Sequence, residues 1–186
     1  MIRNSVKIFE ECFQNNIEKI AITAKTGQEL SFGELWSLAE KFATNWREKG
    51  ANPGDKIALI MENETSYLCC VLACAIGGFV ACPVTPDLLT DQINNIKNLI
   101  KPKIIIETPP AIPKNIEPIS SSRISLKIKN EDLFLIVFTS GTTGSAKGIC
   151  HKFESIVRSA VSFATLSGMD NKTHIYHILP MSYMAG

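Results

Sequence analysis

Residues 56–84 read KIALIMENETSYLCCVLACAIGGFVACPV, and their pattern sets the architecture of the chain. Residues 56–61 have the length and apolar content of a buried strand, and residues 79–84 form a second run of the same kind. Between the two runs, Asn63 is placed to cap a helix over about 64–76. Strand, helix and strand in this order, with nearly all-apolar strands, predict an α/β fold with a mostly parallel sheet and flanking helices.

The same stretch raises the alternative of a membrane span, because residues 68–84 carry no charge over seventeen positions. A transmembrane helix needs about 20 apolar residues. Gly77 and Gly78 interrupt the run in its middle, and Pro83 lies near its end. We therefore predict a buried helix followed by a buried strand, and no membrane span.

The strand–helix rhythm continues toward the C-terminus. Thr90 is placed to cap a helix that Pro102 ends, and residues 104–106 form a third strand. Residues 133–138, LFLIVF, are the strongest strand signal in the chain. A helix over about 152–166 and a last strand over 175–179 complete the pattern. The residues expected to face the core are Ile93, Ile96, Leu99 and Ile100 in the first helix, and Phe153, Ile156, Val157, Ala160 and Ala164 in the second.

Two further segments frame this alternation. Residues 31–50 repeat apolar side chains at helical spacing, with Ser31 and Glu34 as a capping box and Gly50 as a stop. Residues 20–23 and 29–30 flank a turn and predict a hairpin before that helix. Residues 108–132 hold four prolines and predict a surface connection, with a short strand at 124–128. A linker between two domains is the alternative.

Composition narrows the classes of function. The 186 residues carry a net charge of +1, so a nucleic-acid partner is not expected. The six cysteines form no CxxC pair and no zinc-like spacing with the three histidines, and they read as small buried hydrophobes in a reducing compartment. The charged N-terminus is no signal peptide, which favours a cytoplasmic location.

Chemistry is concentrated in residues 138–148, FTSGTTGSAKG, directly behind the strongest strand. Glycines allow the backbone to approach a ligand, successive N–H groups form an anion-binding nest, and Lys147 adds a full positive charge. A triphosphate needs all three features. A flexible Ser/Thr/Gly surface loop is the alternative. The segment is not a Walker A loop, because residue 146 is Ala and residue 148 is Gly.

Residues 139–148 resemble the phosphate-binding signature of the AMP-forming adenylating superfamily, which includes acyl-CoA synthetases, luciferases and peptide-synthetase adenylation domains. That signature reads roughly [YF]TSG[ST]TGxPKG, and only Ala146 departs from it, where Pro is usual. Weaker similarities follow in the family's order: ELSFGEL at 29–35, GDKIA at 54–58, AIGGFVACP at 75–83 and LPMSYMAG at 179–186.

The resemblance implies that ATP, with Mg²⁺, activates a small carboxylic acid to an acyl adenylate. A thiol of coenzyme A or of a carrier protein's phosphopantetheine arm then displaces AMP. The β- and γ-phosphates would be held by Thr139, Ser140, Gly141, Thr142, Thr143, Gly144 and Lys147. Tyr183 stands where many acyl-CoA synthetases have His, so it would lie near the acyl pocket or its gate.

By the same resemblance, residues 1–186 are the N-terminal portion of the large AMP-binding domain. The rest of that domain and a small C-terminal domain are absent, and no catalytic residue is assigned within the chain. Three hypotheses remain: part of an acid–thiol ligase that is inactive as a fragment, a binding module for ATP or pyrophosphate, and an unrelated nucleotide hydrolase. An exposed sheet edge or apolar patch is expected to favour dimers, aggregation or a partner chain. The resemblance also allows an acyl carrier protein as a partner.

Overall fold

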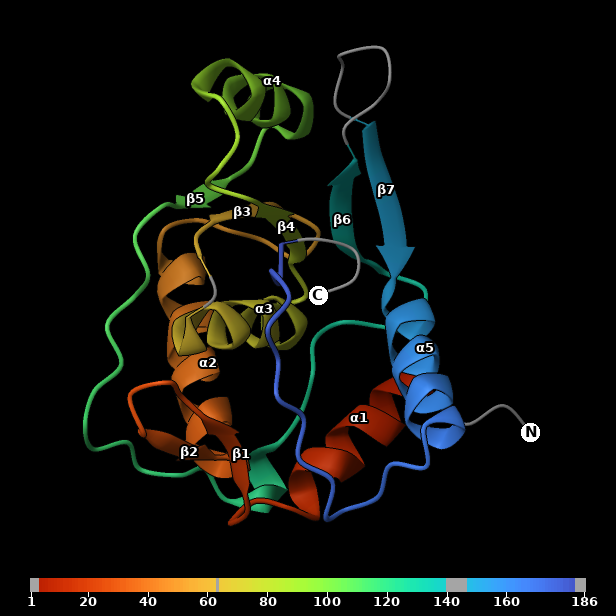
Figure 1. The fold of residues 1–186 in the computed structure, drawn as a ribbon. Coiled ribbons are helices and arrows are strands. Elements are labelled where there is room, and N and C mark those ends of the chain that lie inside the picture. Colours follow the sequence, from red (N-terminus) through yellow and green to blue (C-terminus); the bar gives the residue numbers. More distant parts are fainter. Residues whose placement is uncertain (1–3, 63, 140–146, 183–186) are drawn as a thin grey trace.

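A five-stranded sheet with the order β5–β3–β4–β6–β7 forms the centre of the structure, a computed structural model that describes residues 4–62, 64–139 and 147–182 (Figure 1). The strands are β3 (Lys56–Ile60), β4 (Val80–Val84), β5 (Ile104–Ile106), β6 (Leu133–Thr139) and β7 (Lys147–Lys152). The first four are parallel, and β7 runs antiparallel to β6. The predicted parallel sheet is confirmed.

Helices cover both faces of this sheet. The helices are α1 (Ser5–Gln14), α2 (Phe32–Glu48), α3 (Thr65–Gly77), α4 (Thr90–Ile100) and α5 (Phe153–Leu166), with a short 3₁₀ turn η1 (Ser121–Arg123). Alternate residues of β3 belong to different cores: Ile57 and Leu59 pack with α2 and α3, whereas Ala58 and Ile60 pack with α4. The connection from β3 to β4 and the connection from β4 back to β5 run in opposite directions across the sheet. Because such crossovers are right-handed, their helices α3 and α4 lie on opposite faces.

The predicted hairpin and first long helix are both confirmed. The hairpin pairs β1 (Ile20–Thr23) with β2 (Glu29–Ser31). At the start of α2 the Glu34 N–H donates to Ser31 Oγ at 3.2 Å, and the Ser31 N–H donates to Glu34 Oε2 at 2.7 Å. Gly50 follows the helix with a φ of +84°, a left-handed conformation that favours glycine.

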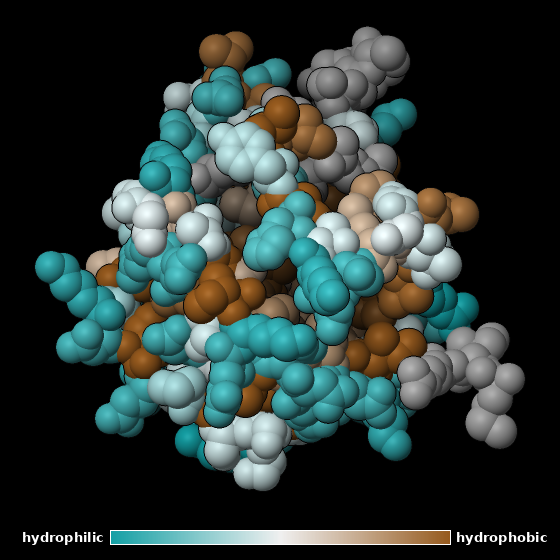
Figure 2. Space-filling model, turned by 60° about the horizontal axis from the view of Figure 1, so that its bottom comes forward, coloured by the Kyte–Doolittle hydropathy of each residue, from teal (hydrophilic) through white to brown (hydrophobic). Residues whose placement is uncertain are grey.

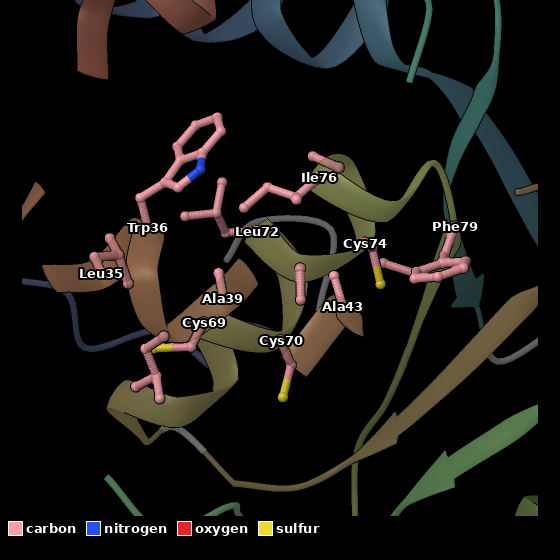
Figure 3. Packing of buried hydrophobic residues seen from close by; sticks show 14 of the residues in the cluster. Leu35, Trp36, Ala39, Ala43, Cys69, Cys70, Leu72, Cys74, Ile76 and Phe79 are labelled. Carbon is pink, nitrogen blue, oxygen red and sulfur yellow. The ribbon is translucent and has the colours of Figure 1, made fainter. Parts of the chain in front are cut away.

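Small side chains let α2 and α3 pack closely. Figure 3 shows Ala39 and Ala43 of α2 beside the α3 residues Cys69 and Cys70, and all four side chains are fully buried. Cys74 and Cys82 are buried as well, so the prediction of cysteines as core residues holds for four of the six. Cys12 and Cys150 are exposed. Within the described residues, no helix has the length and apolar content needed to cross a bilayer.

Two predicted helix caps are wrong. The helix α3 has Glu64 at its N-cap position, one residue after the predicted Asn63, which lies outside the described residues. The helix α4 has Leu89 at its N-cap position, and Thr90 is its first helical residue. A Gln92 side-chain oxygen accepts the Leu89 N–H at 3.1 Å, so a side chain from inside the helix satisfies this donor.

The inward faces of α4 and α5 are also narrower than predicted. Ile96 and Ile100 are buried under the sheet, but Leu99 is 60% exposed, at the border of the buried face of α4. In α5, Phe153 and Val157 are buried, whereas Ala160 is exposed. Phe153 packs against Phe134 of β6 with ring centroids 5.3 Å apart, which anchors only the first turns of the helix.

Residues 108–132 contribute five buried side chains to the main core, so the linker alternative is wrong. The segment forms no strand at 124–128. Its buried apolar side chains pack on the face of α2 and α3, and they are Ile116, Ile119, Ile124, Leu126 and Ile128. The N–H groups of Lys127 and Ile128 donate to carbonyls of Ile76 and Ala75 at the end of α3. Carbonyls at the end of α3 therefore accept hydrogen bonds that, in a strand, would go to a neighbouring strand.

The predicted strand over 175–179 is wrong as well. The backbone there pairs with no described strand. Ile175, Tyr176 and Ile178 are 67%, 91% and 71% exposed. A strand is stabilised by hydrogen bonds to a neighbouring strand, and none of the described strands pairs with this segment.

Candidate functional site

The hairpin of β6 and β7 positions the described part of the predicted phosphate loop. The strand β6 is buried at Phe134, Ile136 and Val137 and reaches the surface at Thr139. The strand β7 returns antiparallel, in a register that sets Lys147 opposite Thr139. The structure therefore brings together the two ends of the loop. Residues 140–146 between them lie outside the described residues, and these include the predicted site residues Ser140, Gly141, Thr142, Thr143 and Gly144.

The strand β7 was missed by the sequence reasoning, which passed directly from the loop to a helix. Gly148 explains how this strand packs so closely on β6. A Cβ atom at this position would lie 3.0 Å from Ile136 Cγ2 and 3.4 Å from Phe138 Cε1. Residues 147–152, KGICHK, hold only two apolar side chains, so they carry no strong strand signal.

The loop leaves the sheet at the edge where open α/β sheets bind ligands. The strands β3, β4 and β6 are parallel neighbours, so their carboxyl ends lie at one edge and about 5 Å apart. After β3 the chain continues into α3 on one face of the sheet, and after β4 it continues into α4 on the other face. A crevice at such a divergence is the usual ligand position in this architecture.

A small crevice of about 190 Å³ lies at this divergence, and the sequence reasoning did not identify it. Met61 and Glu62 follow β3 in its wall, and Thr85, Pro86 and Asp87 follow β4. Pro180 and Ser182 close a further side. The missed signal is that each wall segment comes directly after a predicted strand.

Charge differs between the two parts of this edge. Lys147 is exposed at the loop end of the hairpin, whereas the crevice carries the carboxylates of Glu62 and Asp87. The Asp87 N–H donates to Thr85 Oγ1 at 3.5 Å, and Thr85 Oγ1 donates to Asp87 Oδ2 at 3.4 Å. Phosphate is therefore attracted to the hairpin and repelled from the crevice, which suits an uncharged part of a ligand.

The described residues offer no ready metal centre. No group of three or more His, Cys, Asp or Glu side chains among them is placed to hold a metal ion. The hydroxyl of Thr139 and the ammonium of Lys147 fit phosphate oxygens instead. If Mg²⁺ accompanies a nucleotide here, its ligands include phosphate oxygens and water, as is usual for this ion.

The segment before Tyr183 is tied to the same edge. Tyr183 itself, the predicted residue of the acyl pocket, lies outside the described residues. The Tyr67 hydroxyl of α3 donates to the Met181 carbonyl at 3.3 Å. Burial raises the pKa of Tyr67 far above its ordinary value, so the phenol stays protonated and remains a donor.

Comparisons with known proteins agree with this geometry. Residues 9–186 match the family model described as AMP-binding enzyme. The chain is 23% identical to a long-chain-fatty-acid–CoA ligase, FadD13, of Mycobacterium tuberculosis, over 88% of this chain and 38% of that protein. It is 25% identical to tyrocidine synthase 2 of Brevibacillus parabrevis, over 96% of this chain and 5% of that protein.

Solved structures show the same fold. ATP-bound MatB from Rhodopseudomonas palustris matches with a TM-score of 0.81 at 18% identity, over 98% of this chain and 42% of that chain. A fatty acyl-adenylate ligase from L. pneumophila, in complex with acyl adenylate and pyrophosphate, matches with a TM-score of 0.72 at 21% identity, over 91% of this chain and 34% of that chain.

The chain thus spans about two fifths of FadD13 and of MatB. Its sheet, the hairpin that joins Thr139 to Lys147 and the match over residues 9–186 lead to one conclusion: the chain belongs to the AMP-binding enzyme family of adenylate-forming ligases.

Proposed function

We propose that the protein containing this chain is an AMP-forming acid–thiol ligase. An oxygen of a small carboxylic acid attacks the α-phosphorus of ATP, the bond to the β-phosphate breaks, and pyrophosphate leaves. A thiol sulfur of coenzyme A or of a carrier protein's phosphopantetheine then attacks the acyl carbon, and AMP leaves. The observation that carries the proposal is the β6–β7 register, which sets Lys147 opposite Thr139 at the carboxyl edge of the sheet.

In this proposal the hairpin binds and orients the phosphates. Lys147 supplies the full positive charge, and Thr139, Ser140, Thr142 and Thr143 supply hydroxyl donors. Gly141 and Gly144 let the backbone approach the β- and γ-phosphates. Ala146 stands where the family signature has proline, whose ring restricts φ, but the change removes neither a hydrogen-bond donor nor a charge. Positioning and charge neutralisation are the main tasks of such a site.

The relatives support the chemistry at the level of the reaction class. One is named a fatty-acid–CoA ligase, another a peptide synthase, and a structural neighbour holds acyl adenylate and pyrophosphate. These names differ in the acid and in its acceptor. We therefore propose a carboxylic acid as the substrate class and a pantetheine thiol as the acceptor class, either as coenzyme A or on a carrier protein.

A binding module is the second candidate. The chain spans only 38% of the fatty-acid–CoA ligase it resembles, and within the described residues it offers the phosphate hairpin but no assigned catalytic residue. Such a module binds ATP or pyrophosphate and catalyses nothing. The unrelated hydrolase is no longer a candidate, because the family match covers residues 9–186.

The phosphate site is tested with Lys147→Ala. We expect the Kd for MgATP to rise about 10- to 100-fold, because a hydrogen bond to a charged group contributes about 1.5–3 kcal/mol. Isothermal titration calorimetry measures this change. Lys152→Ala is the matched control, since Lys152 is exposed at the other end of β7, and its Kd should stay within about twofold of wild type. An unchanged Kd for Lys147→Ala contradicts the assignment.

Carboxylate-dependent exchange of labelled pyrophosphate into ATP separates the ligase from the module. A ligase exchanges label only when its acid is present, and Lys147→Ala reduces the rate. A module that binds MgATP shows no exchange with any acid in a panel. Residues 1–186 and the longest natural form of the protein should be assayed in parallel. If only the longer form shows exchange, the residues that it adds are needed for catalysis.

We further propose a cytoplasmic location and self-association through β7. The location is supported by six free cysteines among the described residues. Self-association is supported by the outer edge of β7, which pairs with no described strand. A carrier protein or another partner chain could occupy the same edge.

A further inference from the structure

The C-terminal segment runs along the surface in an irregular conformation before it reaches the crevice. Residues 174–179 form no helix or strand, and the side chains of Ile175, Tyr176 and Ile178 are mostly exposed. The path changes at Met181, which packs against the main core, and at Ser182, which is buried. The segment is therefore anchored at these two residues.

Tyr67 supplies a specific part of this anchor. Its side chain is only 2% exposed and lies on α3, 114 positions before Met181 in the sequence. A buried phenol needs a hydrogen-bond partner, and the Tyr67 hydroxyl donates to the Met181 carbonyl at 3.3 Å. Because burial keeps the phenol protonated, this donor is present over the whole working range of pH.

The anchor defines one wall of the crevice. Pro180 and Ser182 flank Met181, and both line the space between the ends of β3 and β4. The crevice lies one strand away from Thr139, at which the phosphate hairpin begins. A shift of residues 180–182 would therefore change the crevice and leave the β6–β7 register in place.

We propose that Tyr67 is a positioning residue for substrate binding, acting through the Met181 carbonyl to hold residues 180–182 as a wall of the crevice. The acidic rim of Glu62 and Asp87 disfavours phosphate there, so the group positioned is an uncharged portion of the acid or of the thiol. The kinetic part of this inference rests on the proposed ligase function, whereas the anchor itself does not.

Tyr67→Phe tests the proposal, because it removes the hydroxyl and keeps the buried ring. Hydrogen–deuterium exchange measured by mass spectrometry should show faster exchange at Met181 and Ser182 and unchanged exchange in α3. Tyr176→Phe is the matched control, since Tyr176 is 91% exposed, and it should change neither region. Unchanged exchange at Met181 and Ser182 in Tyr67→Phe, or faster exchange throughout α3, overturns the anchor.

Kinetics of the active protein test the positioning role. For Tyr67→Phe we expect the KM of the acid or of the thiol to rise about fivefold, the size expected for one lost neutral hydrogen bond, and the KM of ATP to stay within about twofold. An equal rise for all substrates, or no rise, overturns the role. If wild type shows no carboxylate-dependent activity, the proposed function fails, and deuterium exchange still decides the anchor.

Discussion

At the residue scale, four buried cysteines act as core packing residues and not as reactive thiols. Cys69, Cys70 and Cys74 lie on α3, and Cys82 lies on β4. Each has almost no exposed surface, and none is part of a metal-binding group among the described residues. Burial raises the pKa of Cys69, Cys70 and Cys82 to about 12. These thiols therefore act as inert small side chains near neutral pH.

This burial predicts how stability depends on pH. From about pH 9 to pH 12 the thiols stay protonated in the folded chain, whereas in the unfolded chain they ionise. The unfolded state then holds fewer protons, so the free energy of unfolding falls as pH rises through this range. Urea unfolding at pH 7, 9 and 10.5 measures the slope.

Cys69→Ala isolates one contribution to that slope. We expect the variant to lose stability more slowly than wild type above pH 9, by about 1.4 kcal/mol per pH unit for one thiol. Its stability at pH 7 is lower because the side chain is smaller. Parallel slopes for the two proteins would show that the Cys69 thiol also ionises in the folded state.

Residue patterns predicted a position for the chemistry, but they did not predict its surroundings. The loop composition and Lys147 pointed to a phosphate site, and the structure pairs Lys147 with Thr139. The contact between Tyr67 and Met181 left no local signal, because its partners are 114 positions apart. A hydrogen bond over this separation depends on how α3 and the C-terminal segment pack, which no local pattern encodes.

At the element scale, α2 shows why some boundaries could be predicted. Its first turn is satisfied by Ser31 and Glu34, three positions apart, and its end is followed by Gly50. Such caps are local, so the sequence reports them directly. The caps of α3 and α4 differ from the prediction, because Glu64 and Leu89 occupy the N-cap positions without a side-chain hydrogen bond to the helix N–H groups.

The capping box of α2 is open to a direct test. Ser31→Ala removes the acceptor for the Glu34 N–H, and we expect the free energy of unfolding to fall by about 1 kcal/mol. Thr44→Ala on the exposed side of the same helix is the control, and it should be neutral or slightly stabilising because Ala favours helices. Denaturant unfolding monitored by circular dichroism compares them, and equal effects of the two substitutions would argue against the cap.

Whether an apolar segment forms a strand depends on whether a partner strand lies beside it. The strand β7 forms because β6 lies beside it, and residues 175–179 form no strand because no described strand does. Residues 124–128 donate to the end of α3 and not to a strand. The position of a partner strand therefore separates these outcomes.

At the scale of the whole molecule, apolar surface is not fully covered. Figure 2 shows hydrophobic areas between hydrophilic side chains on the face seen there. On α5, Val161, Phe163 and Leu166 are 45%, 61% and 89% exposed. Single exposed apolar residues are ordinary, but several on one helix beside an unpaired strand edge are typical of an interface.

We therefore expect residues 1–186 to self-associate in a concentration-dependent way. Ile149→Lys places a charge in the exposed edge strand and should shift the population toward the 20.5 kDa monomer in sedimentation velocity. Leu99→Lys, an apolar-to-charged change on α4, should leave the distribution as in wild type. A monodisperse wild-type monomer at high concentration would refute self-association.

Local order in the chain was enough to predict the alternation of strands and helices, the parallel sheet, the first hairpin and the capping box of α2. Each depends on side-chain periodicity or on groups a few positions apart, which a sequence carries explicitly. Packing decided which side of α4 and α5 is buried, which apolar runs became strands, and where the crevice and the Tyr67 anchor formed. These features depend on contacts between segments far apart in the chain. Such contacts contribute to stability only when the tertiary structure brings the segments together, so no local pattern encodes them.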